Sequence, residues 1–286
     1  MPARRSLAAI SLLGALCAGV TGAHAFDDAK YPEWKGQWTR APIPGISGNP
    51  SYDPSKPRGR GEQAPLTAEY RAIFEANLAD QAAGGQGTDG TFTCLATGMP
   101  RSMISYGPME IVILPEVTYI LIEYIHNTRR VFTDGRDWPA KVDPSFEGYS
   151  IGRWIEPDAG GRYGALEIET RFLKGPRAYD ASGLPLHADG QTIVKERIYL
   201  DPANRNLLHD KITTIDHALT RPWTVTQNYR RTPNPRPFWR EYVCAENNTH
   251  VVIGNETYFL SAEGMLMPAK KDQPAPDLRY FNQTRK

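Results

Sequence analysis

Hydrophobic and polar residues alternate with a period of two along most of the chain from Met109 to Leu260. This spacing is typical of half-buried β-strands, and the segments are rich in β-branched and aromatic residues. Turn-forming clusters such as Asp201–Asn204 separate them. The pattern predicts strands at Glu110–Leu114, Val117–Ile125, Arg130–Thr133, Ser150–Glu156, Ala165–Phe172, Thr192–Leu200, Leu207–Ile215, Thr224–Arg230, Glu241–Cys244, His250–Ile253 and Glu256–Leu260.

So many short strands without intervening helices indicate an all-β sandwich or a closed barrel. We favour a single antiparallel lipocalin-like up-and-down β-barrel over residues 91–286, because closure removes the sheet edges and can enclose a pocket. Residues 26–90 are expected to form an N-terminal arm and one short helix. Tyr31–Pro65 is rich in Pro and Gly without periodicity, which predicts an extended arm. The helix is predicted between an N-cap at Thr67 and the Gly84–Gly85 pair, with hydrophobic residues at helical spacing.

The first 25 residues have the features of a secretory signal peptide. Arg4 and Arg5 precede an apolar run from Leu7 to Val20, and Ala23–Ala25 forms a small-x-small cleavage pattern. The run is shorter than the roughly 20 apolar residues of a membrane-spanning helix. The sequence therefore predicts cleavage near Ala25, a periplasmic or secreted protein, and no stable membrane anchor.

Charge and cysteine content bear on three further properties: nucleic-acid binding, disulfide bonds and metal sites. The 33 Lys and Arg balance 32 Asp and Glu, so there is no basic footprint for nucleic acid. Removal of the predicted leader takes away Cys17 and leaves Cys94 and Cys244. In an oxidising compartment this pair indicates one disulfide, with two unpaired buried thiols as the alternative. The histidines His126, His187, His209, His217 and His250 lack close HxH or HxxxH spacing, so neither a metal site nor another cofactor is expected, and metal binding stays as a minority alternative.

Several motifs occur in a characteristic order between residues 90 and 250. They include Cys94 followed by Gly98-Met-Pro-Arg101, Glu123-x-x-His126-x-x-Arg129, Asp134-Gly-Arg136, Gly152-Arg-Trp154 and Arg221-Pro-Trp-Thr224. This order resembles a large family of exported, mostly uncharacterised bacterial proteins. The resemblance implies export but little biochemistry. The chain departs from the family pattern in its longer Ile155–Gly164 turn and in the residues that follow Cys244.

Two groups of polar residues are candidates for chemistry. Glu123 and His126 are three apart in a predicted strand, so they project to opposite faces unless a turn begins at His126. A tight turn at Asn127–Thr128 would place His126, Arg129 and Arg130 at one barrel rim, where the imidazole could act as base or acid and a guanidinium could stabilise an anion. The alternative is a rim histidine that bonds only to a turn. Asp134–Arg136 is expected to form a hairpin turn with an Asp–Arg ion pair.

Further along the chain, Glu196 lies on a mainly apolar strand face. It is therefore either an acid with a raised pKa or the partner of an arginine inside the barrel. If the hairpin register allows, His209 and Lys211 would reach the same cavity. Arg153 and Lys211 are candidates for binding an anion, and Trp154 and Trp223 for contacting a ligand ring.

Two functions fit these residues. The first is a cofactor-independent lyase, isomerase or hydratase for a small aromatic or otherwise apolar ligand. It would use His126, Glu196 and His209 as catalytic groups and Glu123, Arg130, Arg153, Trp154, Lys211 and Trp223 for substrate binding. The second is a non-catalytic periplasmic barrel that binds or carries such a ligand. Convergence of the three catalytic candidates in one pocket would favour the enzyme.

Overall fold

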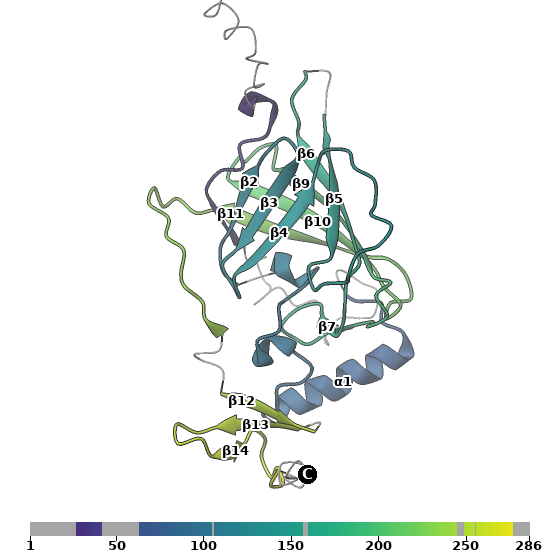
Figure 1. Cartoon of the computed structure of the whole chain (residues 1–286), viewed down its shortest axis with the longest axis vertical. Helices are drawn as coiled ribbons and strands as arrows, with labels where there is room; N and C mark the ends of the chain where they lie inside the picture. The colour runs from purple at the N-terminus through teal and green to yellow at the C-terminus, as the bar shows by residue number, and fades with distance from the viewer. Residues whose placement is uncertain are drawn as a thin grey trace, which may run out of the picture.

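The computed structural model describes residues 27–41, 63–104, 106–156, 160–244, 249–254 and 256–276. The predicted signal peptide lies outside these ranges, as does the part of the arm between residues 42 and 62. The described chain forms a closed nine-stranded barrel with one α-helix and a small separate sheet at one end (Figure 1). The barrel strands are β1 (Gln37–Arg40), β2 (Met109–Ile113), β3 (Val117–Ile122), β4 (Asn127–Phe132), β5 (Tyr149–Ile155), β6 (Ala165–Arg171), β9 (Ile193–Leu200), β10 (Leu207–Ile215) and β11 (Trp223–Arg231).

The barrel is mixed, which corrects the prediction of a purely antiparallel up-and-down topology. Around the ring the order is β1-β11-β10-β9-β6-β5-β4-β3-β2, and β4 pairs with β5 in parallel. In an all-antiparallel closed ring the strand directions must alternate, which requires an even number of strands. Nine strands therefore force a parallel pair. The crossover between β4 and β5 contains Asp134 and Arg136, whose predicted ion pair forms at 2.5 Å, but not as a hairpin turn.

The first strand of the barrel comes from the segment that the sequence predicted to be an extended arm. β1 pairs antiparallel with β11 on one side and with β2 on the other. Trp38 in this strand is fully buried, and its Nε1–H donates to the Trp34 carbonyl at 2.8 Å. Part of the predicted arm is therefore a strand of the barrel wall and closes the ring between β11 and β2.

Inward-facing side chains fill the barrel, because alternate residues of every strand point to the same side. They form a buried apolar cluster that includes Ile120, Ile122, Leu166, Ile198 and Ile212. A second buried cluster lies beyond it, where Phe74 of the helix packs with Tyr179, Leu184 and Trp223.

The predicted helix is confirmed as α1 (Ala68–Ala82). The Thr67 hydroxyl accepts a hydrogen bond from the Tyr70 amide at 3.3 Å, which satisfies a free donor of the first turn. Phe74 is buried, but Ile73 is partly exposed. The short pair β7 (Arg177–Ala178) and β8 (Pro185–Leu186) lies between β6 and β9 in the chain. In the described part of the chain, 3₁₀ turns occupy Asp28–Lys30, Gly90–Thr93 and Arg101–Ile104.

The C-terminal strands form their own sheet, which corrects the prediction that they belong to the barrel. β12 (His250–Ile253), β13 (Glu256–Leu260) and β14 (Leu266–Pro268) pair in that order. Residues 232–244, here called the strap, run outside the barrel from β11 towards this sheet (Figure 1). Glu241–Cys244 is not a strand in the structure.

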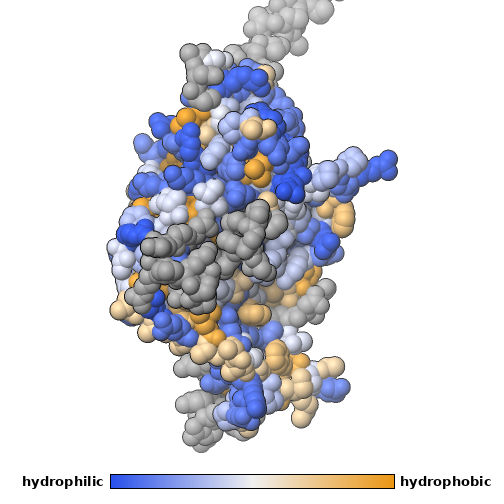
Figure 2. Space-filling model, turned by 180° about the vertical axis from the view of Figure 1, so that it is seen from behind, coloured by the Kyte–Doolittle hydropathy of each residue, from blue (hydrophilic) through white to orange (hydrophobic). Residues whose placement is uncertain are grey.

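The predicted disulfide is present between Cys94 and Cys244, and it ties the end of the strap to the segment between α1 and β2. A disulfide is compatible with an exported protein. Within the described ranges, no helix is long and apolar enough to cross a membrane. Figure 2 shows a back face on which hydrophilic residues cover most of the upper part, with hydrophobic groups more frequent towards the lower end.

Candidate ligand site on the outer face of the barrel

Glu196 is a buried partner of an arginine rather than an exposed acid. Its carboxylate and the Arg129 guanidinium form a bidentate ion pair inside the barrel, with Nη1 to Oε1 at 2.7 Å. Arg129 also donates to Thr170 Oγ1 at 2.8 Å and to Ser150 Oγ at 3.3 Å. Burial alone would lower the pKa of Arg129, but the charge and hydrogen bonds of Glu196 raise it above its usual value. Of the two roles that the sequence left open for Glu196, the geometry matches the structural pair.

Asp210 is a third ionisable group beside this pair, and its side chain is completely buried. Burial, and after it the negative charge of Glu196, raise its pKa well above the usual range for aspartate. The Asp210 carboxyl is therefore neutral at a pH where exposed aspartates are charged.

His209 lies on the opposite face of the barrel wall from Glu196, which corrects the expectation of a shared cavity. In the β9–β10 register Glu196 lies opposite Ile212, whereas His209 lies opposite Tyr199. Since neighbouring residues of a strand point to opposite sides, His209 faces outward while Glu196 faces inward. The His209 ring bonds to Asn228 Oδ1 at 2.6 Å and to Asp201 Oδ2 at 3.0 Å.

His126 and Glu123 hold the strap. The turn between β3 and β4 covers residues 123–126, four residues earlier than predicted, and Asn127 begins β4. Glu123 Oε2 accepts from the Arg240 amide at 2.9 Å, and His126 Nε2 accepts from the Tyr242 amide at 2.8 Å. His126 lines a pocket with Phe238 and Trp239, apart from the pocket that Glu196 lines. Its bond to the strap also differs from the alternative that the sequence left open, which was a bond to a turn.

Three of the other residues that were predicted to contact a ligand lie apart from one another. They are Arg130, Trp154 and Trp223. Arg130 is exposed on the outer face of β4, while its neighbour Arg129 faces inward. Trp154 packs with Trp34, Tyr31 and Tyr163 at one end of the barrel. Trp223 is buried against Tyr179, with 4.5 Å between ring centroids. Both tryptophans therefore contribute to packing within the fold.

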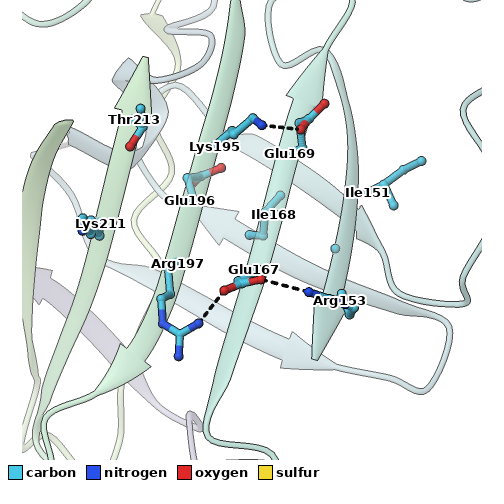
Figure 3. Close-up of a pocket in the computed structure, with 11 residues that line it drawn as sticks. Ile151, Arg153, Glu167, Ile168, Glu169, Lys195, Glu196, Arg197, Lys211 and Thr213 are labelled. Carbon is cyan, nitrogen blue, oxygen red and sulfur yellow. Dashed lines mark hydrogen bonds and ion pairs between the residues drawn. The ribbon is translucent and has the colours of Figure 1, made fainter. Parts of the chain in front are cut away.

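Arg153 and Lys211 do meet, in a pocket on the outer face of β5, β6, β9 and β10 (Figure 3). The pocket has a volume of about 480 Å³. Two cross-strand rows form its floor, because outward-facing residues of paired strands lie side by side. The first row is Arg153–Glu167–Arg197–Lys211, and the second is Ile151–Glu169–Lys195–Thr213.

Ion pairs satisfy only some of the charges in these rows. Glu167 pairs with Arg197 at 2.5 Å and with Arg153 at 3.4 Å, while Lys195 pairs with Glu169 at 3.3 Å (Figure 3). The outward-facing cations are Arg153, Lys195, Arg197 and Lys211, and the outward-facing carboxylates are Glu167 and Glu169. Glu196 also lines the pocket, but its carboxylate is paired with Arg129 inside the barrel, so an excess of two positive charges remains.

Lys211 has no ion-pair partner among the described residues, and Figure 3 shows no interaction from it to the other residues drawn. Its direct cross-strand neighbours are Arg197 on β9 and Thr226 on β11. The diagonal neighbours of Lys211 on β9 and β11 also lack a carboxylate, as do the residues two positions away from it on β10. Two cations thus lie side by side with no acidic residue between them.

Sequence reasoning identified Arg153 and Lys211 but missed Glu167, Glu169, Lys195 and Arg197. Their strands were predicted with nearly correct bounds, and their alternation already placed them on the polar face. The missing information was the strand order. β6 pairs with β9 across the intervening β7–β8 segment, so a pattern along the chain does not reveal that these four residues share a surface.

Comparisons with protein-family models and with curated proteins find no match to this chain. The resemblance to exported bacterial proteins therefore stays a prediction from the motifs, and the function is argued from the site alone.

Proposed function

We propose that this protein is a non-catalytic barrel that binds a small anionic molecule in the pocket over β5, β6, β9 and β10. The observation that carries the proposal is the juxtaposition of Lys211 and Arg197 without an intervening carboxylate. Like charges directly opposite each other on a sheet are destabilising. Glu167 already pairs with Arg197, so a ligand carboxylate or phosphate between the two cations would mainly compensate Lys211, and it would accept charge-assisted hydrogen bonds from both.

The pocket also has room for the body of such a ligand. Its volume of about 480 Å³ lies within the range of small-molecule sites, roughly 300–1,000 Å³. Ile151, Thr213 and the aliphatic parts of the lysines offer apolar contacts beside the charges. We therefore infer a ligand with one anionic group and a compact apolar or aromatic body.

Binding without chemistry is favoured over the lyase hypothesis by the positions of the acid-base candidates. That hypothesis needs His126, Glu196 and His209 in one pocket, whereas they lie at the strap, inside the barrel and on the outer face of β10. The leader-like N-terminus and the Cys94–Cys244 disulfide support an exported binding protein.

Benzoate is a suitable probe because it combines one carboxylate with a small ring, and benzamide is its neutral counterpart. In ¹⁵N-resolved NMR titrations, we expect benzoate to shift amide resonances of β9 and β10, and benzamide to leave them unchanged. Lys211→Gln should weaken benzoate binding by about threefold to tenfold, since solvent screening limits the value of an exposed charge. Raising the salt concentration should weaken it further.

Lys141→Gln is the matched control, because it removes the same charge from an exposed position outside the pocket. It should leave benzoate binding unchanged. Equal responses to benzoate and benzamide, or an equal loss in the Lys141 variant, would refute a specific anion site.

A further inference from the structure

Two histidines and an aspartate from separate loops meet away from the anion pocket. His187 and Asp189 follow β8, and His217 follows β10. One donor atom of each residue lies within 4.8 Å of the donor atoms of the other two. Asp189 Oδ2 is 3.2 Å from His187 Nδ1 and 2.5 Å from His217 Nδ1. Spacing along the chain does not reveal this cluster, since 30 positions separate the two histidines.

A buried carboxylate that is not part of the cluster holds both loops in place. Asp216 Oδ1 accepts from the amides of His187 at 2.9 Å and of Ala218 at 2.8 Å. Its Oδ2 accepts from Thr192 Oγ1 at 2.5 Å. These bonds fix the backbone on either side of His217 and at His187. The two imidazoles are therefore brought together by the fold itself.

The Asp189 carboxylate is also oriented. Its Oδ1 accepts from the Gln191 amide at 3.0 Å, which leaves Oδ2 directed towards the histidines. The Tyr70 ring packs beside His187, with 5.4 Å between ring centroids. Oriented ligands of this kind are the usual support of a metal site.

We propose that His187, Asp189 and His217 form a binding site for a divalent transition metal, with Zn²⁺ as the preferred ion. Two imidazole nitrogens and one carboxylate oxygen suit Zn²⁺ and its neighbours in the first transition row. Mg²⁺ and Ca²⁺ prefer sites made entirely of oxygen. In the tetrahedral geometry of zinc, with bonds of about 2.0–2.2 Å, ligand atoms lie about 3.3–3.6 Å apart. The spacing between Asp189 and His187 already approaches this value.

The metal replaces local hydrogen bonds when it binds. His217 Nδ1 exchanges its bond to Asp189 for the metal, and His187 Nδ1 gives up the bond that it accepts from the Asp189 amide at 3.1 Å. The His217 side chain is 67% exposed, so the ion has access from solvent. Three protein ligands leave a coordination position for water or another ligand. The bound ion would tie the loop after β8 to the loop after β10.

The test uses the full mature chain purified without an affinity tag and stripped of metal with a chelator. Isothermal titration with Zn²⁺ should show one ion per chain, and Mg²⁺ should show none. Co²⁺ should give visible absorption bands that report nitrogen and oxygen ligands. His217→Ala should weaken Zn²⁺ binding by more than about 100-fold, because losing even a residue that only orients a ligand costs about 10- to 100-fold. This side chain is exposed, so we expect the variant to fold.

Two further variants separate this site from incidental binding. Asp189→Asn keeps an oxygen that can accept from the Gln191 amide but loses the charged ligand, and it should also weaken binding. His209→Ala removes a histidine from the other His–Asp pair, His209–Asp201, and should leave binding unchanged. The proposal is overturned if the wild-type chain does not bind Zn²⁺, if His217→Ala binds normally, or if His209→Ala has the larger effect.

Discussion

Three ionisable side chains, Arg129, Glu196 and Asp210, lie within the barrel where apolar residues surround them. Removing an ion pair from water costs several kcal/mol for each ion, and the mutual attraction offsets this only when geometry and hydrogen bonding are good. Arg129 satisfies this condition, because Glu196, Thr170 and Ser150 all accept from it. At the residue scale, the pair therefore links β4 to β9, which are not neighbours in the barrel wall.

Breaking the Arg129–Glu196 pair should be strongly destabilising. Arg129→Met leaves the Glu196 carboxylate buried without its partner, and we expect the free energy of unfolding to fall by about 3–5 kcal/mol. The double variant Arg129→Met/Glu196→Leu removes both charges and should recover most of this loss. Urea unfolding of the single and double variants measures the coupling. A double variant no more stable than Arg129→Met would contradict this account.

Asp210 makes the folding stability of the protein depend on pH in the direction opposite to that of a paired surface carboxylate. Its pKa is raised in the folded state, mainly by burial and then by Glu196. Its contribution to stability is therefore complete below its unfolded pKa of about 3.9. That contribution is lost as the pH rises from there through the folded pKa. Asp210→Asn cannot ionise, so it should remove this loss.

Chemical unfolding of the wild type and Asp210→Asn from pH 4 to pH 9 provides the measurement. The stability of the variant relative to wild type should rise with pH across this range. A difference that does not change with pH would show that Asp210 ionises equally easily in both states.

At the scale of elements, the alternation of side chains predicted most strand positions, but not how the strands join. The inward face of Glu196 followed from the pattern of β9, whereas that of Arg129 did not. The orientation of β4 depends on the length of the turn before it, and this turn begins four residues earlier than Asn127. A shift of one residue exchanges the two faces of a strand. The sequence therefore placed Arg129 and Arg130 together at one rim, whereas in the structure they face opposite sides of the barrel wall.

Other elements were missed because local pattern carries too little information about them. β1 has only four residues in a segment rich in Pro and Gly, and long-range pairing with β2 and β11 stabilises it. The strands β12 and β13 have ordinary strand patterns, and nothing in their residues distinguishes a separate sheet from the barrel. The Lys211–Arg197 and His187–His217 juxtapositions likewise arise from strand order and loop positions.

At the scale of the whole molecule, the disulfide is a long-range constraint on the unfolded chain. Cys94 and Cys244 are 150 positions apart. In the chain-entropy model, closing a loop of this length stabilises the folded state by about 5 kcal/mol. The double variant Cys94→Ser/Cys244→Ser should therefore unfold at a lower denaturant concentration. Wild-type protein treated with a reductant should match it, and an unchanged midpoint in both would contradict this prediction.

The closure of the barrel by β1 also bears on the order in which the protein can fold. Thr39 in β1 and Arg230 in β11 are 191 positions apart and hydrogen-bonded. Ribosomes make the chain from its N-terminus, so β1 exists long before its partner in β11. Until β11 has been synthesised, β1 can pair with β2, but its other neighbour in the barrel does not yet exist. Contacts between such distant segments slow folding. The last step of barrel assembly therefore uses one of the first segments to be synthesised.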